Sequence, residues 1–373
     1  MLQAVDLRDG AVVWSTDLRR DPGVVQVAGA ANGIVVALEF SCDVEVGPKS
    51  VAGFDAGTGK RLWSQPTRGA YGLGKGGSPT LTPALGASPR GVVWVEVRTT
   101  DEIRIRAADL RTGRQLWEAR GTQASSWPLA GNRDVVVFGP HPNLVADPTF
   151  DAPERTLRAI DRRTGAELWK TRVATSGARS MGAATTADAV IAQVDNRLVG
   201  IDIRTGRNLW STDLPVPEGA YNQAWIGAAD GVAVVTQNAG EGRVTATGVD
   251  AATGQLLWSG RPEVLVQSPQ PTDRYPLATV LDSVANLSVA LIDPRSGNPR
   301  WLVSTTGFPN GIGPMSSNTQ TVVPQGYSLA VVDPGSGTAL RTISPPPTSR
   351  SAIIAGNRLV FAGGCTADPE EGG

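Results

Sequence analysis

One nine-residue phrase recurs eight times along the chain, with Asp at its first position, Gly at its fifth and Trp at its ninth. Its clearest copy is Asp161-Arg-Arg-Thr-Gly165-Ala-Glu-Leu-Trp169. The eight copies begin at Asp6, Asp55, Asp109, Asp161, Asp202, Asp250, Asp293 and Asp333. Seven copies end in tryptophan, at Trp14, Trp63, Trp117, Trp169, Trp210, Trp258 and Trp301, whereas the eighth has Arg341 there. Such regular repetition predicts several stacked copies of one structural unit.

The chemistry of the phrase indicates a tight turn between two strands. Apolar runs precede each Asp and follow each Gly, as in a β-hairpin. The Asp carboxylate can accept hydrogen bonds from backbone N–H groups two or three residues further on. The Gly suits the left-handed residue that closes such a turn. The Trp then lies on the second strand, where its large apolar ring and single donor suit docking against a neighbouring unit.

The spacing of the phrases predicts the fold class. Successive Asp residues are about 40 to about 54 positions apart, enough for four strands per repeat. We therefore expect an all-β protein, an eight-bladed β-propeller of four-stranded antiparallel blades. Seven internal blades are expected at about 23–65, 79–119, 127–172, 180–212, 223–260, 276–303 and 312–343.

The two termini are expected to share the eighth blade. Residues 2–18 supply only a hairpin, and the missing strands are expected in 351–362. Pairing of the N-terminal hairpin with these C-terminal strands would close the ring and remove exposed sheet edges. This predicts one domain over residues 1–364, followed by a flexible acidic tail at 365–373.

Binding residues are expected on the face opposite the phrase turns. That face carries the longer connections at 41–50, 66–78, 139–155, 213–222 and 261–275, and function on rigid scaffolds concentrates in loops. Aromatic and cationic side chains there suit a peptide or small ligand. The candidates, most of them near the starts of innermost strands, are Tyr71, Lys75, Trp127, Tyr221, Trp225, Arg274, Tyr275 and Phe308. The alternative is that the inner-strand aromatics pack the wall of the central channel.

Composition excludes several function classes. The net charge is −1 and no basic block is present, so nucleic-acid binding has no electrostatic basis. No apolar run is long enough to span a bilayer. With a single histidine, His141, we assign no catalytic or metal-binding residue. The first phrase begins close to Met1, so we expect a targeting or membrane-tethering segment upstream of this sequence, and a monomer.

The phrase resembles the tryptophan-docking repeat of the pyrroloquinoline-quinone (PQQ) family of eight-bladed propellers. That family contains quinoprotein dehydrogenases and non-catalytic members, among them the lipoprotein propeller of the outer-membrane β-barrel assembly machine. The alcohol dehydrogenases stack PQQ on a disulfide between adjacent cysteines and bind Ca²⁺ beside it, and this chain has no adjacent cysteines. The resemblance therefore implies a non-catalytic member without a cofactor. A PQQ- and calcium-dependent dehydrogenase and a small-ligand sensor are the alternatives.

The two cysteines predict a compartment. Cys42 and Cys365 each follow the second strand of a blade, in blades that are neighbours across the ring closure. We predict a disulfide between them, which would place the protein outside the cytoplasm; the alternative is two unrelated thiols. Together these observations favour a non-enzymatic, extracytoplasmic scaffold that binds a protein or peptide through its loop-rich face.

Overall fold

A computed structural model gives the structure of the chain. It describes residues 1–18, 24–40, 50–67, 88–97, 103–121, 127–139, 156–172, 182–194, 197–214, 221–238, 244–262, 264–265, 277–281, 287–305, 312–317 and 319–363. The described residues are all-β, without helices, and so contain no helix that could cross a bilayer.

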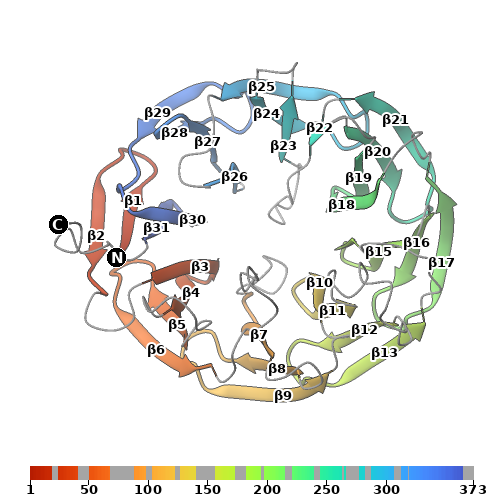
Figure 1. The fold of residues 1–373 in the computed structure, drawn as a ribbon, viewed down its shortest axis with the longest axis horizontal. Coiled ribbons are helices and arrows are strands. Elements are labelled where there is room, and N and C mark those ends of the chain that lie inside the picture. Colours follow the sequence, from red (N-terminus) through yellow and green to blue (C-terminus); the bar gives the residue numbers. More distant parts are fainter. Residues whose placement is uncertain are drawn as a thin grey trace, which may run out of the picture.

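The strands form eight antiparallel sheets, of which seven are four-stranded and one is three-stranded in the described residues. Figure 1 shows the sheets side by side around a common centre, with the first strand of each sheet inside and the last outside. This arrangement is consistent with a β-propeller.

The strand bounds follow the repeat. The first internal sheet contains β3 (Val24–Ala31), β4 (Ile34–Phe40), β5 (Ser50–Asp55) and β6 (Arg61–Pro66). The three-stranded sheet contains β7 (Val92–Val97), β8 (Ile103–Ala108) and β9 (Gln115–Gly121). Next come β10 (Trp127–Gly131), β11 (Val135–Gly139), β12 (Thr156–Asp161) and β13 (Glu167–Arg172), then β14 (Ala183–Thr185), β15 (Ala189–Val194), β16 (Arg197–Asp202) and β17 (Asn208–Asp213).

The remaining internal sheets complete the series. They are formed by β18 (Tyr221–Ala229), β19 (Val232–Asn238), β20 (Val244–Asp250) and β21 (Leu256–Pro262), by β22 (Val264–Leu265), β23 (Leu277–Leu281), β24 (Leu287–Ile292) and β25 (Pro299–Thr305), and by β26 (Met315–Ser316), β27 (Thr321–Gln325), β28 (Ser328–Val332) and β29 (Ala339–Ile343).

Strands from the two termini share one sheet, called the terminal sheet here. Its order is β2-β1-β31-β30, with β1 (Leu2–Asp6), β2 (Val12–Thr16), β30 (Ser349–Ala355) and β31 (Arg358–Gly363). The β1 and β31 strands pair antiparallel from Leu2 opposite Ala362 to Asp6 opposite Arg358. The N-terminal hairpin thus pairs with the C-terminal strands, as the sequence predicts.

Each phrase forms the predicted turn between the last two strands of its sheet. In the Asp202 turn, Oδ1 accepts hydrogen bonds from the N–H groups of Arg204 (3.0 Å) and Thr205 (2.8 Å). The N–H of Gly206 donates to the Asp202 carbonyl at 2.9 Å, and Gly206 has a φ of 72°. A side chain other than hydrogen is disfavoured in this left-handed conformation.

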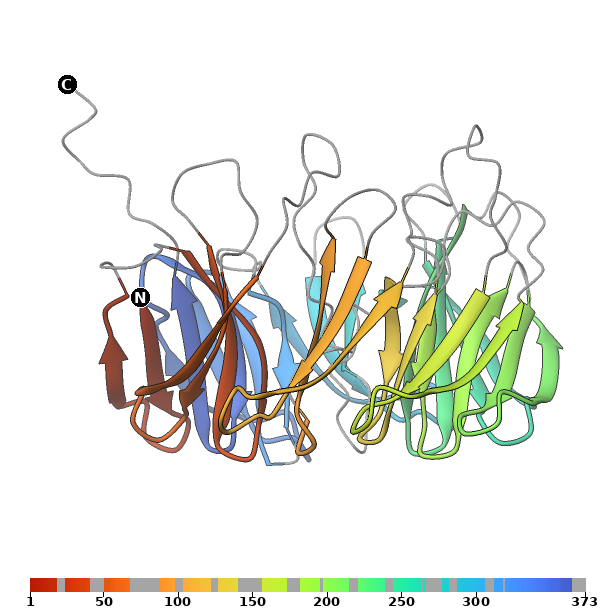
Figure 2. The same cartoon turned by 90° about the horizontal axis from the view of Figure 1, so that it is seen from below.

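All phrase turns lie at one end of the sheets (Figure 2). We call this the turn end and the opposite end the loop end. At the loop end, second strands such as β4 and β31 finish at Phe40 and Gly363.

The core lies between neighbouring sheets. Second and third strands such as β11 and β5 are buried along nearly their whole length, since both of their faces contact another sheet. Outer strands alternate, as in β13, because only one face is covered. Among the fully buried side chains, Trp94 of β7 is 1% exposed.

One predicted boundary is wrong. Residues 261–275 are predicted to form a connection, with the next blade beginning at 276, whereas β21 extends to Pro262 and β22 is the first strand of the following sheet. The reason is that β22 has only two residues, too short for any alternation of apolar and polar side chains to show.

Candidate functional site

The seven phrase tryptophans lie at the seams between sheets. Each indole N–H donates to the backbone carbonyl that follows the Asp of the next phrase, at 2.8–3.0 Å. The pairs are Trp14 with Ala56, Trp63 with Leu110, Trp117 with Arg162, Trp169 with Ile203, Trp210 with Ala251, Trp258 with Pro294 and Trp301 with Pro334. Every one of these bonds joins one sheet to the next in the same direction around the molecule.

Glycines make room for the indoles. A Cβ atom added to Gly113 would lie 2.6 Å from Trp63, and one added to Gly206 would lie 2.7 Å from Trp169. The strand before the Trp also contributes in three hairpins, because a Cβ atom added to Gly53, Gly200 or Gly248 would lie 2.3 Å or less from the indole of the same hairpin. The Gly of the phrase therefore serves both the turn and the neighbouring tryptophan.

The eighth seam, between the β26–β29 sheet and the terminal sheet, lacks this contact. Arg341 occupies the tryptophan position opposite Val331, and its buried Nε has no hydrogen-bond partner among the described residues. A Cβ on Gly10 would meet nothing within 4 Å. This seam is instead packed by an apolar cluster that includes Leu7, Met315, Leu329 and Phe361.

Of the predicted aromatic binding residues, the structure describes the backbone of Trp127, Tyr221 and Trp225. Trp127 is the first residue of β10 and lies opposite Gly139, while Tyr221 begins β18 opposite Asn238. Both therefore lie where the second strand of the sheet finishes, and Trp225 follows within β18. These two sheets lie on the same side of the common centre (Figure 1). Tyr327, which is not among the predicted binding residues, is 96% exposed between β27 and β28 at the same end.

The other predicted binding residues lie outside the described residues. These are Tyr71, Lys75, Arg274, Tyr275 and Phe308, together with Cys42 and Cys365. The strand that follows Arg274 and Tyr275 is β23, a second strand rather than an innermost one. Its first residue, Leu277, pairs with Leu291 near the turn end. The expectation that these two residues precede an innermost strand is therefore wrong.

Two buried carboxylates near the loop end were also missed. Glu39 is 2% exposed and accepts hydrogen bonds from Ser50 and Arg61, while Glu96 is 1% exposed. Glu96 accepts from Trp94 Nε1 at 3.1 Å and from Arg106 Nη1 at 2.9 Å. They lie on β4 and β7, strands of neighbouring sheets that each pair with the strand leading into a phrase turn. When a single Glu lies within an apolar run of five or six residues, the sequence does not show which side chains on other strands will form hydrogen bonds with it.

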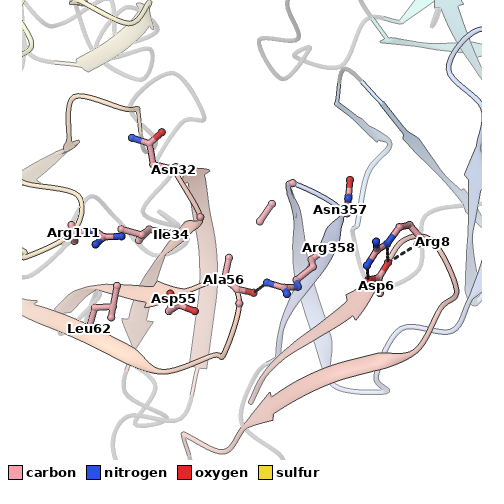
Figure 3. A pocket seen from close by; sticks show the side chains of 14 residues that line it. Asp6, Arg8, Asn32, Ile34, Asp55, Ala56, Leu62, Arg111, Asn357 and Arg358 are labelled. Atoms are coloured by element: carbon pink, nitrogen blue, oxygen red, sulfur yellow. Dashed lines mark hydrogen bonds and ion pairs between the residues drawn. The ribbon is translucent and has the colours of Figure 1, made fainter.

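A polar pocket of about 580 Å³ lies at the turn end, between the terminal sheet and the β3–β6 sheet. The Arg8, Arg111 and Arg358 guanidinium groups line it with the carboxylates of Asp6 and Asp55. Figure 3 shows Arg358 reaching across the seam to Ala56, whose carbonyl it contacts at 2.7 Å. Within the described residues, no group of three or more His, Cys, Asp or Glu side chains could hold a metal ion.

Comparisons with known proteins place the fold and the family. No curated protein matches the chain. Among solved structures, Sqt1 of Saccharomyces cerevisiae is 10% identical, with a TM-score of 0.56 over 93% of this chain and 96% of that one. BamB from Moraxella catarrhalis is 14% identical, with a TM-score of 0.44 over 95% and 88%. A quinohemoprotein alcohol dehydrogenase from Pseudomonas putida HK5 is 12% identical, with a TM-score of 0.48 over 92% and 72%.

The similarity to Sqt1 concerns the fold alone, because only 10% of the residues are identical. The family comparison shows more than the fold, because one family model matches residues 1–147 and 153–361. Those two ranges include all eight phrases. The chain therefore belongs to the family described as outer membrane protein assembly factor BamB.

Proposed function

We propose that the eight sheets are the blades of one closed propeller over residues 1–364, with 365–373 as a tail, and that this propeller is a non-enzymatic, extracytoplasmic scaffold for a protein or peptide. The partner binds at the loop end. The family description, an assembly factor of the outer membrane, supports a role in contacts with other proteins.

The observation that carries the proposal is the distribution of aromatic residues in the described part of the chain. Trp127 and Tyr221 begin innermost strands at the loop end, and Tyr327 projects almost fully exposed from the same end. Tyrosine and tryptophan are enriched at binding hot spots, because they combine large apolar area with one polar group. Tyr327 lies on a two-residue turn and is 96% exposed, so its ring contributes nothing to the apolar core. Exposing this apolar ring to water is unfavourable, which favours a role for the side chain in contacts with a partner.

Site-specific photo-crosslinking tests the proposal. A photoreactive amino acid replaces Tyr327 at the loop end and, as the matched control, the exposed Arg204 at the turn end. Expressed in the native host, the 327 variant is expected to crosslink to one envelope protein that the 204 variant does not capture. Equal capture from both positions, or a cytoplasmic protein as the sole product, contradicts the proposal.

Calorimetric titration with PQQ in the presence of Ca²⁺ tests the non-enzymatic part. Absence of heat, together with absence of dye-linked alcohol or glucose oxidation, is expected. Stoichiometric binding at micromolar concentration would instead support a quinoprotein dehydrogenase and direct attention to the central channel.

A further inference from the structure

The eighth seam, between the β26–β29 sheet and the terminal sheet, keeps the acceptor side of a tryptophan-docking site. In each of the other seven seams, one indole packs on the phrase Gly and donates to the carbonyl that follows the phrase Asp. Trp14, for example, would lie 2.5 Å from a Cβ atom on Gly59 and donates to the Ala56 carbonyl at 2.9 Å. The Gly and the carbonyl of one phrase turn therefore lie within reach of a single indole.

The turn that begins at Asp6 presents the same two groups. Gly10 has a φ of 79°, and its N–H donates to the Asp6 carbonyl at 2.9 Å. The Asp6 N–H donates to the Ala11 carbonyl, also at 2.9 Å. The Asp55 turn closes through the same two bonds, at 2.8 and 2.9 Å. Because the backbones of these turns agree, Gly10 and the Leu7 carbonyl have the spacing that their counterparts have in the other seams.

Neither of the two groups is used in the eighth seam. A Cβ atom on Gly10 would meet nothing within 4 Å, whereas at the other seven phrase glycines it would overlap an indole. Leu7 is 0% exposed, and its carbonyl accepts no hydrogen bond from any described residue. A buried backbone acceptor without a partner costs free energy. The turn therefore combines open space over Gly10 with an acceptor that lacks its donor.

Arg341 takes the place of the tryptophan on the preceding sheet without replacing its contacts. It leaves the space over Gly10 empty, and its buried Nε has no hydrogen-bond partner among the described residues. An arginine side chain is long enough to turn outwards and place its guanidinium in water. Such a movement would satisfy Nε, so the side chain can leave the seam when another group enters.

Val12 adds an apolar surface beside this space. It is 58% exposed, more than any other large aliphatic side chain of the described residues. It lies opposite Val5, which belongs to the apolar cluster of the eighth seam. Residues opposite one another on paired strands share a face of the sheet, so Val12 faces this seam too. At the same phrase position, other copies carry polar residues such as Arg61, Gln115 and Glu167.

We propose that the eighth seam binds a tryptophan side chain of a partner protein. The indole lies over Gly10 and donates its N–H to the Leu7 carbonyl, while the Arg341 side chain turns out to solvent. This chain has no tryptophan to spare. Seven of its ten fill the other seams, and Trp94, Trp127 and Trp225 lie on strands of other sheets. A second copy uses its tryptophans in the same way, so the occupant is a different polypeptide.

The strands that border the seam favour a polypeptide over a free indole compound. Strands β29 and β2 are the last strands of their sheets and follow one another on the outside of the molecule (Figure 1). An outermost strand leaves a row of backbone N–H and C=O groups unpaired. An extended segment can bind to such groups through its own backbone, which places its side chains next to the seam.

Saturation-transfer NMR with the whole protein tests this assignment. The probes are the blocked tripeptide acetyl-Gly-Trp-Gly-amide, the same tripeptide with 1-methyltryptophan, and free indole. We expect dissociation constants in the millimolar range for the tryptophan tripeptide. The methylated probe keeps the ring but has no N–H, so it is expected to bind at least about fivefold more weakly, the effect of losing one hydrogen bond. Indole, which has no peptide backbone, is also expected to bind more weakly than the tripeptide.

Two substitutions of one residue locate the site. Arg341→Trp fills the seam from within the chain and is expected to abolish binding of the tripeptide. Arg341→Ala clears the seam and is expected to bind at least as tightly as the parent. If the arginine itself held the ligand, both variants would bind more weakly. Leu302→Trp is the matched control, because Leu302 is 48% exposed on the outer strand β25 and an indole there leaves the eighth seam unchanged.

Four results would overturn the proposal. They are no binding of the tryptophan tripeptide to the parent, equal binding of the two tripeptides, binding of indole as tight as that of the tripeptide, and parent-like binding by Arg341→Trp. None of them bears on the photo-crosslinking at Tyr327, at the opposite end, so the two proposals fail independently.

Discussion

Trp169 illustrates what a single phrase tryptophan does. Its ring is 8% exposed, packs in a cluster with Leu157 and Ala159, and donates to the Ile203 carbonyl of the next sheet. One side chain therefore combines apolar burial with a hydrogen bond that satisfies both a buried donor and a backbone acceptor.

Replacing Trp169 with Ala is expected to lower the free energy of unfolding by about 3–5 kcal/mol, because a large buried side chain leaves a cavity. The neighbouring Leu168→Ala is the control, since Leu168 is 38% exposed and its loss should change stability by no more than about 0.5 kcal/mol. Denaturant unfolding measures both. A loss below about 1 kcal/mol for Trp169→Ala would contradict the docking role.

Arg341 shows the opposite case. Its buried Nε lacks a partner among the described residues, and an unsatisfied buried donor costs free energy. Arg341→Trp is expected to raise the free energy of unfolding by about 1–2 kcal/mol, by removing that donor and adding an indole near Gly10. Arg341→Ala separates the two effects, because it removes only the donor. If the Trp and Ala variants are equally stable, the eighth seam has no slot for an indole.

The phrase turn joins local and long-range requirements in one element. Its Gly must adopt a positive φ and must also leave room for the tryptophan of the previous sheet, as Gly113 does for Trp63. Gly10 shares the first requirement, with a φ of 79°, but not the second.

Comparing Gly10 with Gly113 separates the cost of a left-handed backbone from the cost of displacing the tryptophan ring. Gly10→Ala is expected to cost about 1–2 kcal/mol, the penalty of a left-handed residue with a side chain. Gly113→Ala should cost about 1–3 kcal/mol more, because its Cβ would overlap Trp63. Thermal or denaturant unfolding of the two variants gives the difference directly. Equal losses would show that the turn alone explains the conserved spacing of Gly within the repeat.

The same turns make stability depend on pH. The pKa of Asp6 is lowered from 3.8 to about 2, chiefly by the hydrogen bond from the Arg8 side chain. The hydrogen bond from the Thr205 side chain lowers the pKa of Asp202, and that from Thr58 lowers the pKa of Asp55. Since the folded-state pKa lies below the unfolded one, the unfolded chain binds protons first as the pH falls.

Stability from these turns is therefore complete above about pH 4 and is lost as the pH falls towards about 2. In Asp202→Asn the amide oxygen still accepts the turn hydrogen bonds but does not titrate. The variant is expected to lose about 0.5 kcal/mol less than the parent between pH 5 and pH 3, a modest difference because the group is exposed. Urea unfolding at the two pH values measures it, and identical losses in both proteins would rule out this contribution.

At the level of the complete chain, the terminal sheet connects residues that are furthest apart in sequence. Its strand β31 and the neighbouring β4 finish at the loop end, two residues before Cys365 and Cys42 respectively. The predicted disulfide would then link two neighbouring sheets next to the pairing of β1 with β31.

Peptide mapping without reductant is expected to find Cys42 linked to Cys365 in protein purified from an oxidising compartment. Loss of the bond in Cys42→Ser is expected to cost at most about 4–5 kcal/mol, the chain-entropy limit for so long a loop. The double variant Cys42→Ser/Cys365→Ser serves as the control and should match the single variant. Two free thiols in the purified parent protein would exclude the bond.

The sequence allowed prediction of the sheets, the turns and the contacts of the tryptophans, because each of these depends on chemistry within one repeat. Asp, Gly and Trp occur at fixed spacing, and the neighbour that each Trp contacts is simply the next repeat. Even the shared terminal sheet could be predicted, since residues 2–18 lack two strands that only 351–362 supply.

Features that join different repeats could not be predicted in this way. Arg358 contacts Ala56 across a separation of 302 residues, and neither residue is unusual by itself. Glu39 and Glu96 likewise acquire their partners only when strands pair. Tyr327 was missed because a lone tyrosine on a polar turn has no periodicity to distinguish it. The candidate sites at both ends depend on such residues, so they required the structure.

The indole hydrogen bonds give the circle of sheets a direction. Each of seven sheets donates to the one that follows, from Trp14 at the beginning to Trp301 near the end. A complete repeat inserted at any of these junctions would bring its own donor and its own acceptor, so no indole or carbonyl would be left unmatched. Duplication or loss of whole repeats could therefore change the circumference of such a protein while preserving every junction, whereas an insertion of half a repeat would interrupt the series.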